Sequence, residues 1–187
     1  MWYLGTDDAG GLEALKQVGF ATSDDGIRWQ RHVGNPVIPV NPDLACERLA
    51  IAVPRVIRDG KLYKVWYCCY EKNDTYAIGQ AESFDGIRWF RSPHNPVMDR
   101  SGEGWDSDMT AYPTVIRTAD RYLMWYSGNG YGGAGIGIAS APVPTGDIYF
   151  RIGPVPRPDA QWSAWQPVGE AAPPREAYIQ FAVCAVD

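Results

Sequence analysis

The sequence predicts an all-β fold, and three observations lead to this prediction. First, the 187 residues include 20 glycines and 15 prolines, which divide the chain into short segments. Second, these segments are rich in Val, Ile, Tyr and Trp, and no amphipathic stretch of helical length carries convincing caps. Third, long motifs return at nearly constant spacing. With 45% hydrophobic residues, a chain of this length can form one packed domain but not two large ones.

Two sets of motifs define the repeat. Residues 18–29 (VGFATSDDGIRW) return after 60 positions as residues 78–89 (IGQAESFDGIRW). The loop Asn35-Pro36-Val37 returns at the same spacing as Asn95-Pro96-Val97. Residues 53–58 (VPRVIR) return after 59 positions as residues 112–117 (YPTVIR), each followed by a Trp-Tyr segment. Third copies of the Trp-Tyr and Gly-x-Ala-x-Ser segments stand at residues 1–3 and 136–140.

One repeat unit therefore consists of a Pro-x-Val-Ile strand, a Trp-Tyr strand, an Ile-Gly-x-Ala strand, an Asp-Gly turn, an Ile-Arg-Trp strand and an Asn-Pro-Val loop. Four antiparallel strands that recur in this way are typical of a propeller blade, because each sheet needs a neighbour on both faces. Asp25 and Asp85 are predicted to fasten the hairpin turns and not to act in catalysis. The tryptophans of the repeat are predicted to pack between blades: Trp2, Trp29, Trp66, Trp89 and Trp125.

The repeats divide the chain into two parts. Residues 1–141 hold about three units, at about 1–40, 41–99 and 100–141, and Met1 aligns with the second strand of a unit. Residues 142–187 lose the repeat and contain eight of the prolines, with three further strands predicted at 147–151, 162–166 and 177–183. This Pro-rich β segment is predicted either to complete a blade or to belong to a sandwich-like module. The expected fold is thus a partial β-propeller with a C-terminal β segment.

Charge and composition exclude several classes of function. The net charge is −5 and no cluster of Lys and Arg occurs, which argues against nucleic acid as a partner. No run of 18 apolar residues and no leader-like start are encoded, so we expect a soluble protein without a membrane partner and, by default, a cytoplasmic one. Four cysteines and two histidines without a C-x-x-C pair predict no metal site.

The motifs resemble those of a known superfamily. Trp-Tyr-Ser-Gly at residues 125–128, together with the Ile-Gly-x-Ala-x-Ser, Asp-Gly-Ile-x-Trp and Asn-Pro-Val segments, resembles the five-bladed propellers of the glycoside hydrolases of families 32, 43, 68 and 130. The resemblance covers about residues 1–141. It implies a central funnel lined by the innermost strand of each blade, with an acid and a base from different blades beside the glycosidic bond. Five such blades need about 300 residues, so about three are represented here.

The resemblance also implies where catalytic carboxylates belong. The family pattern places one directly before the Pro of the innermost strand, where this chain has Val53 and Tyr112. The remaining candidates at the mouth of these strands are Glu47, Asp106 and Asp108, of which Glu47 and Asp106 are repeat-equivalent. If they converge, such carboxylates raise one another's pKa and form an acid and base pair. The alternative for Asp106 is that it only caps a loop turn.

Three further residues are predicted to bind substrate. Arg55 follows Pro54 and can hold a sugar hydroxyl or a carboxylate in a bidentate way, although a salt bridge to Glu47 is equally open. Glu71 breaks the repeat at a place where packing alone does not require a carboxylate. Tyr112 occupies the position before the inner-strand proline.

Three functions follow as expectations. The first is hydrolysis of a glycosidic bond by a pair of carboxylates, without a redox cofactor. The second is a propeller that binds carbohydrate but does not turn it over. The third is a truncated propeller that assembles with further copies of itself, because an open stack exposes hydrophobic edges that native proteins seldom leave uncovered.

Overall fold

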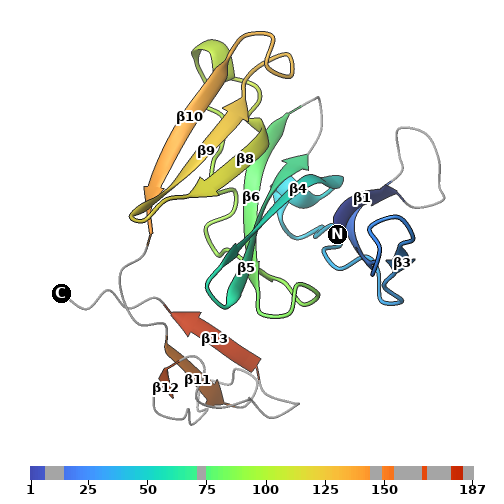
Figure 1. Ribbon diagram of the computed structural model, residues 1–187. Coiled ribbons are helices and arrows are strands. Elements are labelled where there is room, and N and C mark those ends of the chain that lie inside the picture. The colour runs from blue at the N-terminus through green and yellow to red at the C-terminus, as the bar shows by residue number, and fades with distance from the viewer. Residues whose placement is uncertain (7–14, 71–74, 144–148, 154–165, 168–177, 183–187) are drawn as a thin grey trace. The chain divides into compact units, whose positions relative to one another are not determined.

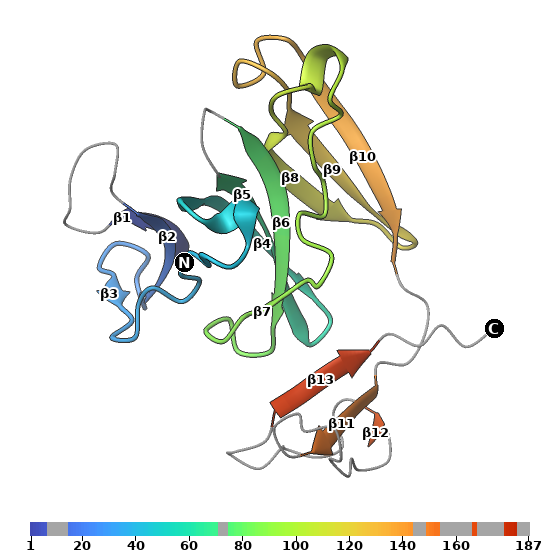
Figure 2. The same ribbon diagram turned by 180° about the vertical axis from the view of Figure 1, so that it is seen from behind.

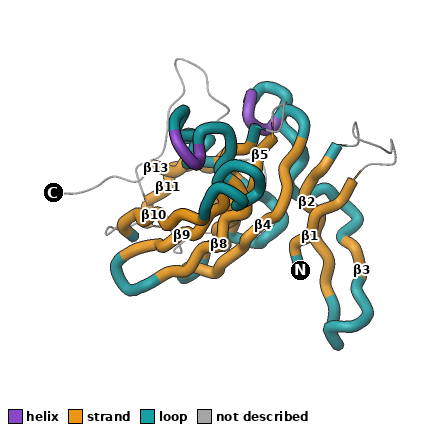
Figure 3. Tube along the Cα trace, turned by 90° about the horizontal axis from the view of Figure 1, so that it is seen from above, coloured by secondary structure: helices purple, strands orange, loops and turns teal. Residues whose placement is uncertain are grey.

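The computed structural model describes residues 1–6, 15–70, 75–143, 149–153, 166–167 and 178–182. The chain divides into two compact units, Met1–Ala141 and Pro142–Asp187. Strands make up nearly all of the regular structure, and short 3-10 turns occur at η2 (Ala45–Glu47) and η3 (Gly104–Asp106), drawn in purple in Figure 3. The predicted all-β class is therefore confirmed.

The strands of the first unit form three groups, which lie side by side in chain order (Figures 1 and 2). Group 1 contains β1 (Trp2–Thr6), β2 (Lys16–Thr22) and β3 (Gln30–Arg31). Group 2 contains β4 (Ala50–Asp59), β5 (Leu62–Tyr70), β6 (Tyr76–Ser83) and β7 (Phe90–Arg91). Group 3 contains β8 (Ala111–Arg117), β9 (Arg121–Ser127) and β10 (Ile136–Pro142). Consecutive strands pair antiparallel within groups 1 and 2, as do β8 and β9.

Equivalent contacts join the groups. Lys16 of β2 pairs in parallel with Ala50 of β4, which links groups 1 and 2 into one seven-stranded sheet. Tyr76 of β6 forms the corresponding parallel bridge with Met109, just before β8. The members of the two bridges differ by 60 and 59 positions, so the sequence repeat is also a repeat of the structure.

Group 2 is covered on both faces. Nearly every side chain of β5 is buried. On one face Tyr63 meets Trp2 of group 1, with ring centroids 5.4 Å apart. On the other face Trp66 meets Tyr122 of group 3 at 5.7 Å. Each sheet thus shields the flat side of its neighbour, as expected for blades of a propeller.

The Asp-Gly turns are longer than predicted. Asp25 Oδ1 accepts hydrogen bonds from the backbone N–H of Ile27 at 2.8 Å and of Arg28 at 2.7 Å, and Asp85 repeats both contacts. Because these N–H groups are bound by a side chain, they do not join a β-ladder. The predicted Ile-Arg-Trp strands are therefore wrong, and only the two-residue strands β3 and β7 follow. The structural role predicted for Asp25 and Asp85 is confirmed.

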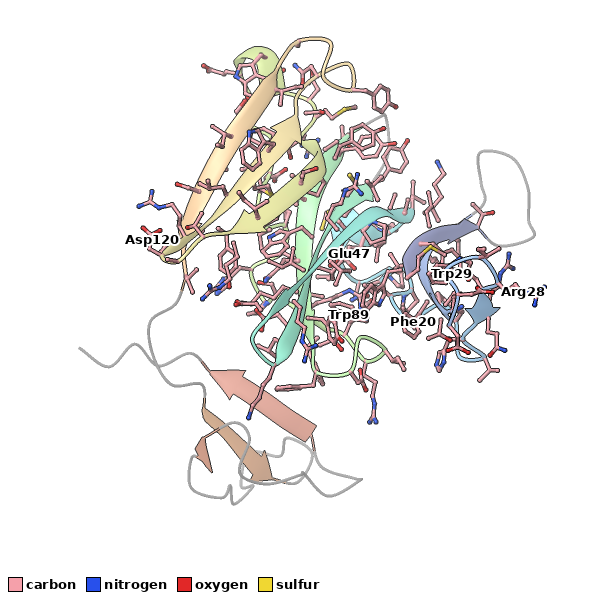
Figure 4. The ribbon with its side chains drawn as sticks, viewed as in Figure 1. Phe20, Arg28, Trp29, Glu47, Trp89 and Asp120 are labelled. Carbon is pink, nitrogen blue, oxygen red and sulfur yellow. The ribbon has the colours of Figure 1, made fainter. Side chains whose placement is uncertain are left out.

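The tryptophans of the repeat differ in how far they are buried. Trp2 donates its indole N–H to the carbonyl of Gly86 in group 2 at 2.7 Å, and Trp66 is 8% exposed, as predicted. Trp29 and Trp125 are 43% and 37% exposed, so the prediction of blade-to-blade burial is wrong for them. They belong to groups 1 and 3, the two ends of the row. Figure 4 shows the same separation, with Arg28 and Asp120 at opposite sides of the first unit.

The second unit has a small sheet of its own. Strands β11 (Tyr149–Gly153), β12 (Gln166–Pro167) and β13 (Tyr178–Ala182) pair in the order β12-β11-β13. Each residue of β11 has an antiparallel partner in β13. Among the described residues of the whole chain, no helix is long and apolar enough to cross a membrane.

Candidate functional site

A glycine in each group brings a tyrosine ring flat against the backbone. A Cβ added to Gly79 of β6 would stand 2.4 Å from the ring of Tyr67, its partner on β5. The same close approach, at 2.6 Å, joins Gly19 with Tyr3 and Gly137 with Tyr126. The glycine of the Gly-x-Ala motif leaves room for the tyrosine ring on the strand, because any side chain at this position would displace the ring. The ring in turn fixes where the tyrosine hydroxyl points.

In group 2 this hydroxyl holds a buried carboxylate. The Tyr67 hydroxyl donates to Oε1 of Glu47 at 2.6 Å, and Arg91 Nε donates to Oε2 at 2.5 Å. Asn95 Nδ2 donates to the Tyr67 hydroxyl at 2.9 Å and lies 3.3 Å from Glu47 Oε1. Glu47 itself has no exposed surface, and Figure 4 labels it within the packed first unit. Burial, followed by the charge of Glu47, raises the pKa of Tyr67, so the hydroxyl keeps its proton as a donor.

This arrangement changes the interpretation of Glu47. A carboxylate without accessible surface cannot reach a substrate, so we do not retain Glu47 among the candidate catalytic residues. The salt bridge considered between Arg55 and Glu47 is also absent, because Arg91 takes that place. Asn95 was noted from the sequence only as part of the repeated Asn-Pro-Val loop, and Arg91 was not singled out, although it recurs 60 positions earlier as Arg31. The recurrence of Arg31 as Arg91 is the signal that could have found this arginine.

Asp106 repeats the place of Glu47 in group 3. It is half-buried, and its Oδ2 accepts a hydrogen bond from the Tyr126 hydroxyl at 3.1 Å. Asp108 is exposed and accepts from Ser107 Oγ at 3.1 Å. The loop between them is held by Asn129, whose Oδ1 accepts from the N–H of Asp108 at 2.9 Å. The structure thus gives Asp106 a partner that fixes it, and leaves the carboxylate of Asp108 facing solvent.

The inner strands carry equivalent bulges. Val53 and Tyr112 adopt positive φ values of 51° and 54°, and the pairing of β4 and β8 shifts register at these residues. For a non-glycine residue this conformation costs about 1–2 kcal/mol, and bulges of this kind often re-aim a side chain beside a functional site. The structure therefore has the special backbone at the position where the resemblance implies a carboxylate. The side chains that it presents there are those of Val and Tyr.

Four tyrosines form a continuous row at the joint between groups 2 and 3. Ring centroids are 4.9 Å apart for Tyr70 and Tyr76, 6.0 Å for Tyr76 and Tyr131, and 6.1 Å for Tyr131 and Tyr112. We refer to these four residues as the tyrosine row. Tyr112 and Tyr131 are 40% and 51% exposed, so the row has an accessible end. Glu71, which follows Tyr70 directly, lies outside the described residues.

Arg55 lies on the inner strand β4, two positions after the bulge at Val53. Its side chain is exposed, and among the described residues it has no ion-pair or hydrogen-bond partner. Burial raises the pKa of Cys68 to about 11, while the backbone N–H of Tyr112, which donates to Cys68 Sγ at 3.0 Å, and then the charge of Arg55 act in the opposite direction. Tyr112 therefore contacts Cys68 directly, and the charge of Arg55 acts on the same thiol. In the described parts of the chain, no three His, Cys, Asp or Glu residues are placed to hold a metal ion.

Comparison with known proteins gives relatives of unknown function. No family model matches the chain. The uncharacterized proteins Rv1502 and MT1551, from Mycobacterium tuberculosis strains H37Rv and CDC 1551, are each 33% identical over 138 residues. The match covers 74% of this chain and 42% of each relative. The chain therefore spans less than half the length of these curated relatives.

Solved structures identify the fold. A glycoside hydrolase matches with a TM-score of 0.55 and 22% identity, over 78% of this chain and 40% of its own. A thermostable family-43 glycoside hydrolase matches with a TM-score of 0.53 and 18% identity, over 71% of this chain and 45% of its own. A family 117 glycoside hydrolase from Zobellia galactanivorans matches with a TM-score of 0.55 and 19% identity, over 68% of this chain and 38% of its own. The chain has the fold of part of a glycoside hydrolase propeller, which confirms the resemblance found in the motifs.

Proposed function

We propose that the first unit binds carbohydrate at the surface made by the tyrosine row and Arg55. The observation that carries this proposal is an accessible aromatic surface together with the guanidinium of Arg55, which has no partner among the described residues; both are located at the inner-strand bulges Val53 and Tyr112. The likeness to glycoside hydrolase propellers supports the choice of ligand class.

The chemistry of the two side-chain types suits a sugar. The C–H groups on one face of a pyranose ring pack well on an aromatic ring, and the tyrosine hydroxyls at the rim can hydrogen-bond to the sugar. Burial raises the pKa of Tyr76 and of Tyr112, so both hydroxyls remain neutral donors at physiological pH. A guanidinium offers several N–H groups in one plane, which can bind two adjacent hydroxyls or a carboxylate.

Hydrolysis of a glycosidic bond is the second candidate function, and Asp108 is the observation that favours it. This exposed carboxylate lies on the loop that Asn129 holds by a hydrogen bond. Asn129 itself stands two residues before Tyr131 of the tyrosine row. Hydrolysis requires a second carboxylate across the bond. Asp106 is the other described candidate, and its bond from Tyr126 favours an anchoring role.

The experiment is a glycan screen followed by calorimetry on the full chain and three variants. Tyr112→Asn removes the ring and keeps a residue that tolerates positive φ, and Arg55→Ala removes the guanidinium. Trp125→Asn is the matched control, because this tryptophan is 37% exposed in group 3 but lies outside the row. We expect Tyr112→Asn and Arg55→Ala to weaken binding about tenfold or more, and Trp125→Asn to leave it unchanged.

The same preparations separate the two candidates. Release of product from a bound oligosaccharide that Asp108→Ala abolishes would support hydrolysis. Binding without release would support the non-catalytic function. If no glycan binds, or if the control weakens binding as much as Tyr112→Asn does, the proposed site is wrong.

A further inference from the structure

Two cysteines of the first unit lie together, one on a turn and one on a strand. Cys46 belongs to η2, the 3-10 turn that precedes group 2, and Cys69 belongs to β5, against which η2 packs. Cys69 lies in the apolar cluster that also contains Ile51 and Val65, and Cys46 packs against this cluster. A hydrogen bond joins the two thiols. Neither the proposed carbohydrate site nor the contacts of Glu47 use these sulfurs.

The adjacent Cys68 belongs to the other face of β5, because successive side chains of a strand point to opposite faces. Cys68 packs in a separate cluster with Met109, and its Sγ accepts a hydrogen bond from the backbone N–H of Tyr112 at 3.0 Å. Among the described cysteines, Cys69 is therefore the one that faces Cys46.

Both thiols line one cavity of about 230 Å³, whose walls also include Tyr76, Asn95 and Arg100. A water molecule occupies about 30 Å³ in the liquid, so a cavity of this size admits a small polar molecule such as hydrogen peroxide. Cys46 is half-buried, whereas Cys69 is 1% exposed. A reagent that enters the cavity therefore meets Cys46 first.

The two sulfurs differ in how readily they ionise. The hydrogen bond from Cys69 lowers the pKa of Cys46 and outweighs burial and the charges of Glu47 and Asp99, which act in the opposite direction. The same bond, followed by burial, raises the pKa of Cys69. Cys46 is thus the first to become a thiolate, which is the form of cysteine that attacks peroxides. Cys69 stays beside it as a protonated thiol.

The surroundings favour a disulfide over a bound metal ion. A soft metal ion held by this pair needs both sulfurs as thiolates. The charge of Glu47 raises the pKa of both thiols, so two thiolates beside this buried carboxylate would be costly. A disulfide carries no charge and suits an apolar cluster.

We propose that Cys46 and Cys69 form a reversible disulfide when the protein meets hydrogen peroxide. The Cys46 thiolate attacks one peroxide oxygen, the O–O bond breaks, and the departing hydroxide takes up a proton to give water. The Cys69 sulfur then attacks the sulfur of the resulting sulfenic acid, the S–O bond breaks, and the hydroxyl leaves as water with the Cys69 proton. Two thiols lose two electrons and one peroxide becomes two waters. A dithiol reductant reverses the bond by exchange.

The test treats the folded full chain with a small molar excess of hydrogen peroxide, blocks the remaining thiols with N-ethylmaleimide and maps tryptic peptides by mass spectrometry without reduction. A chain with Cys184→Ser is treated in parallel, because Cys184 lies outside the described residues. In both chains we expect the peptide of Cys46 to be joined to the peptide that holds Cys68 and Cys69, and dithiothreitol to separate them. The cross-link should form at least about tenfold faster in the folded chain than in urea, because folding holds the sulfurs together.

Two matched variants identify the partner, since trypsin does not separate Cys68 from Cys69. In the Cys184→Ser background, Cys69→Ser should abolish the cross-link and Cys68→Ser should leave it intact. Dimedone, which reacts with sulfenic acids, gives a second readout. With Cys69→Ser it should accumulate on Cys46, because the sulfenic acid then has no thiol to resolve it.

Several results would overturn the proposal. One is that peroxide gives no cross-link to Cys46 in the folded chain, and another is that the cross-link forms as fast in urea. A third is that Cys68→Ser abolishes the cross-link while Cys69→Ser keeps it. A fourth is that dimedone fails to label Cys46 in Cys69→Ser. No sugar is present in these measurements, so their outcome is independent of the proposed carbohydrate site.

Discussion

Arg91 Nε and Glu47 Oε2 lie 2.5 Å apart although the two residues are 44 positions apart in the chain. The carboxylate comes from the turn that precedes group 2, and the guanidinium comes from the last strand of that group. The pair therefore ties the first and last elements of one sheet together. The carboxylate has no access to water, so the pair is stable only as long as both partners are present.

Removal of Glu47 should destabilise the first unit. Glu47→Ala leaves Arg91, Tyr67 and Asn95 without their shared acceptor, and we expect the free energy of unfolding to fall by about 3 kcal/mol. Urea unfolding followed by tryptophan fluorescence measures the change. The control is Asp108→Ala, which removes an exposed carboxylate and should cost less than about 0.5 kcal/mol. Equal losses in the two variants would contradict the anchoring role.

The glycine of the Gly-x-Ala motif should not tolerate a methyl group. Gly79→Ala places a Cβ 2.4 Å from the Tyr67 ring, and we expect a loss of about 1–3 kcal/mol in the free energy of unfolding because the ring must move off the strand. Gly5→Ala is the matched control in β1, since its Cβ would stand 3.7 Å from the nearest ring atom. The two variants are compared by thermal unfolding. Similar midpoints for both would show that the ring is free to shift.

Acid should weaken the Asp-Gly turn of group 2. Burial alone would raise the pKa of Asp85, but hydrogen bonds from the N–H groups of Arg88 and Ile87 outweigh it and lower the pKa below its usual value. The turn then contributes stability above the unfolded pKa of about 4, and this contribution is lost as pH falls through the lower folded value. We expect the free energy of unfolding to decline between pH 5 and pH 2, and less steeply in Asp85→Asn. Asp24→Asn, which removes an exposed carboxylate from the equivalent turn of group 1, serves as the control, and a slope as shallow as that of Asp85→Asn would contradict the assignment.

The thiols should differ in reactivity. A hydrogen bond from Cys69 lowers the pKa of Cys46, whereas burial raises that of Cys68 to about 11. At pH 8 only about one Cys68 in a thousand is the reactive thiolate. Iodoacetamide labelling with peptide mass mapping should therefore modify Cys46 well before Cys68 in the folded chain, and both alike in urea. Equal rates in the folded chain would show that Cys68 is accessible.

The repeat could be predicted from the sequence because its motif residues are required by local backbone geometry. Glycines such as Gly79 and turn residues such as Asp85 are required by local geometry, and each recurs visibly along the chain. The Ile-Arg-Trp strands were not predicted correctly, because strand propensity does not reveal that Asp25 and Asp85 bind the backbone N–H groups that follow them. Local propensity gives way to side-chain capping in such turns.

The candidate site was harder to predict than the fold. Glu47 and Asp106 are repeat-equivalent carboxylates, and spacing alone cannot say whether such a pair faces a ligand or a neighbouring arginine. The decisive partners of Glu47 lie 20 to 48 residues away along the chain. The tyrosine row was missed for the same reason, except for Tyr112, since its four members are adjacent only after groups 2 and 3 have packed.

At the bulges of Val53 and Tyr112 the backbone conformation does not depend on which side chain the position carries. The left-handed turn before each proline is already in place, and aspartate accepts that conformation more readily than valine or tyrosine does. A single codon change at either position would thus install an acidic group on a scaffold that needs no rebuilding. Gain and loss of catalytic power in such a sheet can then occur without any alteration of its architecture.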